Sequence, residues 1–401
     1  MNAKYLAVSL AVVMIAGSMF LVPGASGGRN QPKWMELVYL DADNSLDVST
    51  GAHHVSVVED DYNELMSIGS TSDVVVYVLA DRFDGPANLF KIEKGSMTEM
   101  MGWAMNGKEL NMGDPATLKN VVSYTMKQSN PLHTLLMFWD HGSPEYVAWD
   151  DHDGNGGSDK LTHNEVIRAL SGIHVDVIGA DECLVGQVDV MYEYASKGLS
   201  TDYFCASETY TGWRGYPYDW ILRELVDNPS MTEREVAVMM IEQVNLLLSE
   251  NPYSGEEVNS HTAVDMSRVI ELGQSVIDLG NLLSEDVKDN AGIISKSRGG
   301  ACYSYGGNAA NLVDLKTFVQ LVAKNSQVSD VKAACARVID VFDETVIALQ
   351  VTQTVDHQLY GLGIMLPNHS WESPSYYADY MLPSDGWMDF LEAYWGAAGS
   401  I

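Results

Sequence analysis

His141 and Cys183 are the residues of this sequence whose types and positions best suit covalent chemistry. A cysteine thiolate attacks a carbonyl carbon when an imidazole lies within reach to move protons and N–H groups stabilise the oxyanion that develops. Gly142 follows the histidine and can offer its N–H without a side chain in the way. We therefore expect a dyad of His141 and Cys183, with the backbone N–H groups of Gly142 and Cys183 as oxyanion donors.

The alternative is a structural role, in which the thiol is buried in the core and the imidazole lies in a turn, the commoner situation for an arbitrary Cys and His. Here each candidate follows a short apolar run that ends in an aspartate, Asp140 in one case and Asp181 in the other. We expect Cys183 to open a helix over Leu184–Ala195, whose positive N-terminal end would favour the thiolate. This context favours catalysis.

Short apolar runs alternate with longer amphipathic stretches from Trp34 onward, the pattern of a mostly parallel sheet flanked by helices. In an open sheet of this class, chemistry takes place beyond the carboxyl ends of the strands. The polar residues that follow the runs should therefore share one rim. The expected strands are Met35–Leu40, Val74–Ala80, Thr134–Trp139, Val175–Ala180 and Tyr203–Ala206.

The segment between His141 and Cys183 has the pattern of a loop, a helix and a strand. Thr162 and Glu165 form a capping box that opens the helix. Such a segment is a right-handed crossover between two parallel strands of one sheet. Two residues that are far apart in the sequence can therefore lie side by side.

The pattern becomes mainly helical after Pro229, and we divide the chain into a main α/β domain over residues 31–250 and a mainly helical region over 251–401. A late apolar run, Tyr360–Leu366, is expected to return to the sheet as a strand. The boundary rests on composition alone. The expected helices are Pro115 to about Lys127, Thr232–Ser249, Asp265–Leu283, Asn311–Ala323 and Ser329–Leu349.

Composition bounds the function classes. The chain has 401 residues, of which 46% are hydrophobic, enough to bury a large core. The formal net charge of −32 with only 23 Lys and Arg excludes nucleic acid as a partner, because neutralising phosphates needs clustered basic residues. The spacing of the four cysteines fits neither a metal site nor a disulfide scaffold: Cys183, Cys205, Cys302 and Cys335.

Residues 1–27 have the pattern of a signal peptide, with Lys4, an apolar run from Tyr5 to Val22 and then small residues. The alternative is an uncleaved membrane anchor, because an apolar run of about 18 residues is near the lower limit of a spanning helix. Both interpretations place the domain outside the cytoplasm, secreted or anchored at the cell surface. Contact with a membrane is expected only if the segment stays uncleaved.

At these motifs the chain resembles the clostripain family of cysteine peptidases, in the clan of caspases, gingipains, legumains and separases. The His-Gly and Asp-x-Cys elements, in this order and at this spacing, are the specific part. The resemblance implies a caspase-like three-layer α/β sandwich over residues 31–250, endopeptidase activity on polypeptides and no cofactor for the chemistry. The matching segments are Tyr39–Leu46, Asp140–Ser143, Asp159–Thr162 with Glu165, Asp176–Gly186, Ala206–Thr209, Tyr216–Tyr218, Asn311–Asp314 and Gly361–Ile364.

Members of this family typically cleave after Arg or Lys, with carboxylates in the primary specificity pocket. The resemblance therefore makes Asp181, Ser207, Glu208 and Arg214 the expected substrate-binding residues. Arg214 departs from the family, because many relatives have an acid or a neutral residue there. A guanidinium that points into the pocket would offset Asp181 and oppose a basic side chain; on a solvated loop it would have no such effect.

The segment Asp151–Asp159 resembles the first nine positions of a calcium-binding loop, although Thr162 stands where a full EF-hand has a bidentate Glu. A flexible acidic linker is the alternative. Relatives are often cut in this region, so Lys160 is a candidate self-cleavage point within the 151–160 loop if basic specificity holds. The expected calcium ligands are Asp151, Asp153, Asn155 and Asp159.

The leading hypothesis is thus a secreted cysteine endopeptidase that forms an acyl-enzyme. The alternative from another class is a catalytically silent surface protein that binds calcium or a partner on the same scaffold. The presence of both His141 and Cys183 argues against that alternative. Transpeptidation shares the acyl-enzyme, and the sequence does not distinguish it from hydrolysis.

Overall fold

A nine-stranded sheet in the order β12-β10-β9-β8-β5-β1-β2-β3-β4 dominates this computed structural model. The structure describes residues 31–47, 57–212, 214–250, 259–302, 311–352 and 358–399. The five expected strands are confirmed as the parallel centre of the sheet: β1 (Trp34–Ala42), β2 (Val74–Arg82), β5 (His133–Trp139), β8 (His174–Asp181) and β9 (Ser200–Ser207). Antiparallel strands form both edges: β3 (Gly85–Glu93) with β4 (Ser96–Glu99), and β10 (Ser260–Asp265) with β12 (Val346–Val351).

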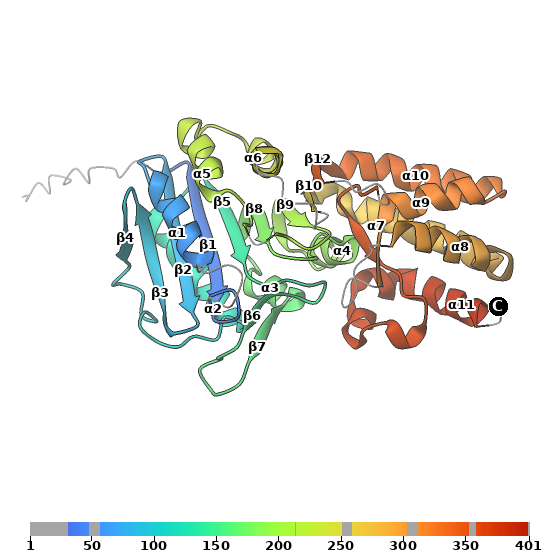
Figure 1. Ribbon diagram of the computed structural model, residues 1–401, viewed down its shortest axis with the longest axis horizontal. Helices are drawn as coiled ribbons and strands as arrows, with labels where there is room; N and C mark the ends of the chain where they lie inside the picture. The colour runs from blue at the N-terminus through green and yellow to red at the C-terminus, as the bar shows by residue number, and fades with distance from the viewer. Residues whose placement is uncertain are drawn as a thin grey trace, which may run out of the picture. The chain divides into compact units, whose positions relative to one another are not determined.

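Helices bury both faces of the sheet, so the strands are apolar on both sides. In β1, Leu37 and Tyr39 pack into one core while Val38 and Leu40 pack into the other. One face is covered by α1 (Val57–Ile68), α5 (Tyr218–Asp227) and α6 (Glu233–Glu250). The other face is covered by α2 (Pro115–Ser129), α3 (His163–Ala169), α4 (Val188–Ser196) and α7 (Val269–Glu285), which confirms the expected α/β sandwich (Figure 1).

The helix starts expected from the sequence are confirmed at two positions. Asp114 caps α2 by accepting the N–H of Ala116, and Thr162 with Glu165 forms the capping box of α3. The crossover from β5 to β8 also carries a hairpin of β6 (Tyr146–Asp150) and β7 (Asp159–Thr162), which extends away from the sheet (Figure 1). The segment thus joins two neighbouring parallel strands, as predicted.

The helix expected directly after Cys183 begins later than the sequence suggested. Helix α4 starts at Val188, and Leu184 has a left-handed φ of 64° that no helix tolerates in its first turn. The N–H groups of Leu184 and Gly186 are instead donated to the carbonyls of Thr209 and Ser207 at 2.8 and 2.7 Å. The prediction that Cys183 lies at a helix N-terminus is therefore wrong, because this backbone pairs with a distant loop.

The C-terminal strands also differ from expectation. Tyr360–Leu366 contains β13 (Gly363–Met365), but this strand pairs with β11 (Leu312–Asp314) in a separate two-stranded sheet. The strands that do return to the main sheet are β10 and β12, and β12 begins where the expected helix Ser329–Leu349 was still running. Helix α10 (Ser329–Thr345) ends first, because Val346–Val351 gains a partner strand that only the tertiary fold provides.

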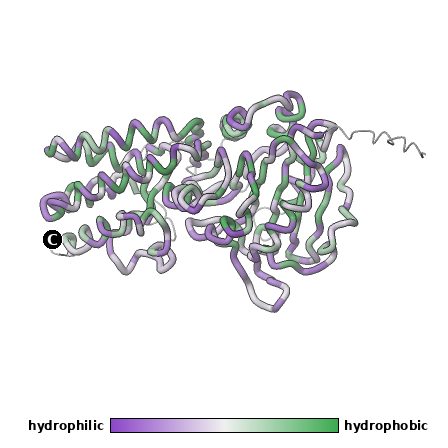
Figure 2. The backbone as a smooth tube through the Cα atoms, turned by 180° about the vertical axis from the view of Figure 1, so that it is seen from behind, coloured by the Kyte–Doolittle hydropathy of each residue, from purple (hydrophilic) through white to green (hydrophobic). Residues whose placement is uncertain are grey.

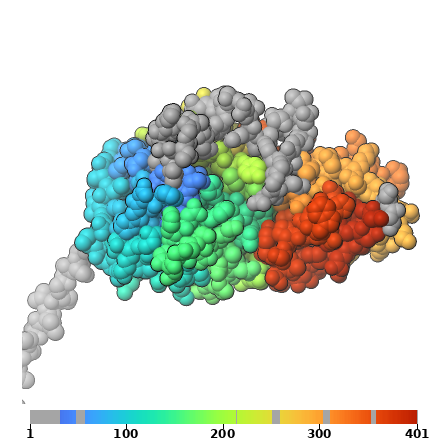
Figure 3. Space-filling view, turned by 60° about the horizontal axis from the view of Figure 1, so that its bottom comes forward, coloured from blue at the N-terminus to red at the C-terminus, as the bar shows by residue number. Residues whose placement is uncertain are grey.

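The C-terminal helices α8 (Val287–Ala301), α9 (Leu315–Asn325), α10 and α11 (Met388–Ala398) alternate hydrophilic and hydrophobic stretches along their length (Figure 2). The C-terminal segment packs against the segment that holds α3 and α4 (Figure 3). There Met381 donates its N–H to Glu193 at 2.7 Å, and Tyr380 donates its hydroxyl to the Pro144 carbonyl at 2.8 Å.

Residues 31–401 form one compact unit, because strands from both sides of the expected boundary share one sheet. The boundary at 250/251 adjoins residues 251–258, and the expected signal segment covers residues 1–27; both stretches lie outside the described residues. Within the described ranges, no helix is long and apolar enough to span a bilayer.

Candidate functional site

His141 and Cys183 leave the sheet side by side. Strands β5 and β8 are parallel neighbours in which Trp139 is paired directly with Asp181, and each candidate lies two residues beyond its member of this pair. The two loops touch at Gly142, where an added Cβ would lie 2.8 Å from the Cys183 carbonyl oxygen and 2.7 Å from Cβ of Glu182. Only glycine allows this approach. The structure therefore brings the two expected loops together on one rim.

The sulfur of Cys183 is half-buried against the loop that follows β9. Thr211 donates its N–H to Sγ at 3.3 Å, and its hydroxyl donates to the carbonyl of Glu182 at 2.8 Å. An N–H directed at sulfur stabilises negative charge there. Thr211 was missed from the sequence, because no local pattern indicates that its loop folds back over Cys183.

His141 contacts a residue that the sequence analysis also missed. Its Nε2 lies 2.9 Å from the hydroxyl oxygen of Ser45, in the loop after β1. Burial lowers the pKa of His141 below its ordinary 6.5, although the charge of Asp151 opposes this shift. The imidazole is therefore neutral at neutral pH and can accept a proton. The only signal for Ser45 was its place within the motif Tyr39–Leu46.

Asp140 holds the histidine loop in place. Its buried carboxyl accepts the N–H groups of His141 and Trp149, and it accepts the side-chain amide of Asn44 at 2.7 Å. Burial raises the pKa of Asp140 well above its usual range, against the effect of these donors. The side chain of Asp140 thus fixes the backbone at His141 and Trp149.

Glu182 occupies the space beneath Gly142. It is 1% exposed, and neither of its carboxyl oxygens has a hydrogen-bond partner within the part of the chain that the structure describes. Burial raises the pKa of Glu182 well above its usual range, and the nearby acids Asp140 and Asp181 add to the shift. A protonated carboxyl at this position avoids placing a fixed negative charge beside the sulfur.

Asp181 is covered by the loop that follows β9. Its carboxyl accepts the N–H of Tyr216 at 3.0 Å, and an added Cβ at Gly215, which has a φ of +57°, would lie 2.3 Å from its oxygen. Burial raises the pKa of Asp181 to about 6, against the hydrogen bonds from Tyr216 and Tyr218. The expected specificity acid therefore contacts this loop directly.

Ser207 and Glu208 face inward. Both are 0% exposed; Ser207 donates its hydroxyl to the carbonyl of Thr209 at 3.1 Å. Glu208 accepts the hydroxyl of Ser260 at 2.7 Å and the N–H of Gly361 at 2.8 Å. The expected direct contact of these side chains with substrate does not fit this arrangement, because they support the loop from within.

Arg214 lies among acidic residues of α1 and α5. It lines a cavity of about 550 Å³ between α1 and α5, together with Asp61, Glu64 and Asp219. Burial raises the pKa of Glu64 to about 7, and the charge of Arg214 acts in the opposite direction on this carboxyl. This geometry therefore does not favour the expected case in which the charge of Arg214 cancels that of Asp181.

The expected calcium ligands do not converge. Asp153 accepts the N–H groups of Asn155 and Gly157 at 2.7 and 3.0 Å within a local turn, while Asp159 accepts the side-chain amide of Asn111 at 2.8 Å. Oxygen ligands must surround one point to bind calcium. In this conformation, the exposed loop with Asp151, Asp153, Asn155 and Asp159 has the geometry of a turn.

A different acidic group beside the rim could hold a hard cation. Carboxyl oxygens of Asp43, Asp81 and Glu109 lie within 4.8 Å of one another. Asp81 is 0% exposed, and both of its oxygens are without a hydrogen-bond partner among the residues that the structure covers. Burial raises the pKa of Asp81 to about 9. Oxygen ligands of this kind suit Ca²⁺.

Lys160 is held within the β6–β7 hairpin. Its ammonium lies 4.4 Å from the ring centre of Tyr146 and 4.6 Å from that of Trp149, a cation–π arrangement. Its backbone belongs to β7, where Lys160 is paired with Trp149 of β6. The expected self-cleavage point is therefore not presented as a free, extended segment.

The sequence model of the Clostripain family matches residues 38–395. The chain is similar to clostripain of Hathewaya histolytica, with 26% identity over 230 residues, which cover 50% of this chain and 43% of that protein. The match thus spans less than half the length of this relative.

Two solved structures share the fold. One is a secreted cysteine protease from Bacteroides thetaiotaomicron in complex with an irreversible peptide inhibitor, with a TM-score of 0.65 and 20% identity over 92% of this chain and 100% of that chain. The other is an inactive zymogen protease from Parabacteroides distasonis, with a TM-score of 0.67 and 16% identity over 88% of this chain and 98% of that chain. These likenesses confirm the expected fold class.

Proposed function

The chain belongs to the clostripain family, and we propose on that basis that it is a cysteine endopeptidase with Cys183 as nucleophile and His141 as acid/base partner. The observation that carries this proposal is the direct pairing of Trp139 with Asp181, which supports a position for both groups on one rim. The contact between Gly142 and the Cys183 loop supports it further.

In the proposed reaction, the thiol of Cys183 passes its proton to the neutral imidazole of His141, and the sulfur attacks the scissile carbonyl carbon. The N–H groups of Gly142 and Cys183 donate to the oxyanion. When the tetrahedral intermediate collapses, the C–N bond breaks and His141 returns its proton to the departing amine. A water molecule, deprotonated by His141, then hydrolyses the thioester and restores the thiol.

We extend the proposal to cleavage after Arg or Lys, with Asp181 as the specificity acid. The position of Arg214 beside Glu64 and Asp219 supports this, because these carboxyl groups offset its charge.

We extend the proposal to the location of the protein, its processing and its use of calcium. The pattern of residues 1–27 supports an extracytoplasmic location. Self-processing after Lys160 would require the β6–β7 hairpin to open. No cofactor takes part in the chemistry. If calcium supports activity, the convergence of Asp43, Asp81 and Glu109 favours that cluster as its site.

The test is cleavage of a mixed peptide library by the full chain, read by mass spectrometry. Cys183→Ala and His141→Ala should each lower turnover by more than about a thousandfold. Cys302→Ala is the matched control, because Cys302 is also half-buried and should be dispensable. Unchanged turnover in Cys183→Ala would sink the assignment.

The same peptide library and variants distinguish the endopeptidase from two other functions. A silent binding scaffold predicts no cleavage and no labelling of Cys183 by a peptide inhibitor that acylates thiols. A transpeptidase predicts ligated product when an amine nucleophile is added. Hydrolysed product alone supports the endopeptidase.

A further inference from the structure

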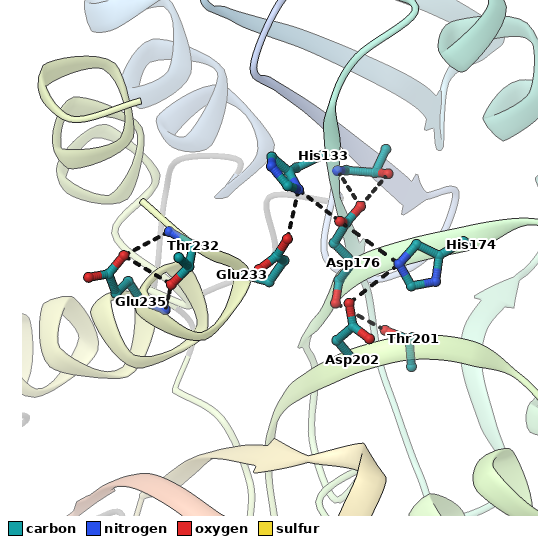
Figure 4. A network of polar contacts seen from close by, with 9 residues as sticks. His133, His174, Asp176, Thr201, Asp202, Thr232, Glu233 and Glu235 are labelled. Atoms are coloured by element: carbon teal, nitrogen blue, oxygen red, sulfur yellow. Dashed lines mark hydrogen bonds and ion pairs between the residues drawn. The ribbon is translucent and has the colours of Figure 1, made fainter. Parts of the chain in front are cut away.

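A second group of ligand-type side chains lies at the amino ends of the strands, whereas His141 and Cys183 follow their carboxyl ends. His133 opens β5, His174 opens β8 and Asp176 follows two residues later. Asp202 lies in β9, and Glu233 is the first residue of α6. The side chains of these five residues point toward one another around Asp176 (Figure 4).

The nitrogen of His133 lies close enough to two carboxyl oxygens for all three atoms to share one ion. Its Nδ1 lies 3.0 Å from Oδ1 of Asp176 and 2.9 Å from Oε1 of Glu233. An imidazole nitrogen carries at most one hydrogen, which cannot point well at two carboxylates at once. Ligand atoms bound tetrahedrally to one ion at about 2.1 Å lie about 3.4 Å apart. All three ligand atoms here lie within 4.8 Å of one another.

The ligand atoms are held in orientation by their other contacts. The second oxygen of Asp176 accepts the N–H and the hydroxyl of Thr134 at 2.8 and 3.0 Å. The ring of His133 packs on the buried ring of Trp34, with 4.9 Å between the ring centres. Such supporting contacts characterise metal ligands and raise their affinity.

The charge balance also favours a cation. Asp176, Glu233 and Asp202 bring three carboxylates together, and in the described ranges no Lys or Arg forms an ion pair with them. Their ion-pair partners there are the imidazoles of His133 and His174. A divalent ion would offset two of these three negative charges.

Solvent reaches the group from one side. Glu233 and Asp202 line a surface cavity of about 450 Å³, together with Tyr203 and Asp265. The side chain of Glu233 is 30% exposed, whereas that of Asp176 is 9% exposed. An ion can therefore enter from the cavity and meet the buried carboxylate last.

We propose that His133 Nδ1, Asp176 Oδ1 and Glu233 Oε1 bind one divalent transition-metal ion of the zinc class. The mixture of imidazole and carboxylate suits zinc, whereas calcium prefers oxygen ligands alone. His174 and Asp202 lie on the other side of Asp176, where His174 Nε2 is 3.9 Å from Oδ1 of Asp176. The ion would tie the start of α6 to the sheet and take no part in peptide cleavage.

Calorimetry with Zn²⁺ tests this on the full chain, purified without a polyhistidine tag and dialysed against EDTA. One equivalent should bind, and His133→Gln and Glu233→Gln should each weaken binding at least about tenfold, since even supporting contacts of ligands are worth that much. Glu235→Gln is the matched control, because Glu235 lies two residues further along the same helix and its capping role tolerates Gln.

A second measurement guards against variants that fail to fold. Zn²⁺ should raise the melting temperature of the unmodified chain and of Glu235→Gln but not of Glu233→Gln, whose circular dichroism should match the unmodified chain. A tenfold excess of Ca²⁺ should not displace Zn²⁺. Absence of binding, equal binding in Glu233→Gln, or loss only in His174→Gln would overturn the proposal. None of these outcomes depends on peptidase activity.

Discussion

Trp139 at the end of β5 is paired directly with Asp181 at the end of β8. Each member is anchored on the same side of the sheet: the indole N–H of Trp139 donates to Asp61 at 2.6 Å, and Asp181 accepts the N–H of Tyr216 at 3.0 Å. The loops that begin beyond this pair therefore start from fixed points.

Gly142→Ala should lower kcat/KM by about a hundredfold, because small displacements of reacting groups are that costly. The new Cβ would lie 2.8 Å from the Cys183 carbonyl oxygen and force the two loops apart. Steady-state kinetics measures the effect. Gly292→Ala is the control, because nothing lies within 4 Å of its added Cβ; equal kinetics in both variants would contradict the proposed contact.

The acid limb of kcat/KM should lie below pH 6.5. Burial lowers the pKa of His141, so its neutral form persists to lower pH than that of an ordinary histidine. Asp151→Asn should move the limb further down, because the charge of Asp151 raises this pKa. A pH profile from about 4 to 8 checks both. An upward movement in Asp151→Asn would refute this account of the histidine.

Arg214→Gln should change the preference for Arg over an uncharged isostere before the cut by less than about threefold. Arg214 lines the cavity between α1 and α5, and the groups that act on Asp181 are burial, Tyr216 and Tyr218. Asp181→Asn should reduce the preference more than about tenfold, because it removes the acid itself. Paired peptide substrates measure both ratios. A large gain of basic preference in Arg214→Gln would show that its guanidinium reaches the pocket.

Glu36→Gln should stabilise the protein at pH 8 by about 3 kcal/mol and leave its stability near pH 4.5 unchanged. Glu36 is 1% exposed, and burial raises its pKa to about 7 from 4.5. The unfolded chain therefore loses this proton first, so the stability of the unmodified protein falls between these two values and stays lower above them. Urea unfolding at both pH values measures the difference. Glu99→Gln, an exposed position in β4, should have no such pH-dependent effect.

Lys160 in the folded protein should be cut more slowly than in a free peptide of the same sequence. The hairpin pairs its backbone with Trp149, and the ring of Trp149 contacts its ammonium. Trp149→Ala in an inactive Cys183→Ala chain should speed cleavage after Lys160 by added active enzyme, as read from the new termini by mass spectrometry. If cleavage after Lys160 is as fast before this change as after it, the hairpin does not protect the bond.

Much of the site followed from local patterns. The apolar runs that became β5 and β8 and the capping box at Thr162 are encoded by neighbouring residues, and the crossover rule then implies adjacent strands. Those rules place His141 and Cys183 on one rim without coordinates. They do not reach the partners of either residue, because Ser45 and Thr211 come from other strands' loops.

The sequence by itself thus determined the five central strands, the adjacency of β5 and β8, the helix starts at Asp114 and Thr162, and the candidate residues His141 and Cys183. Tertiary structure alone decided that α4 starts at Val188, that β10 and β12 close the sheet edge, that Glu208 is buried and that Arg214 lines the cavity between α1 and α5. The physical reason is the distance along the chain over which each kind of interaction acts. Periodicity and capping act within a few residues, whereas strand pairing, loop contacts and burial depend on residues brought together from distant parts of the chain.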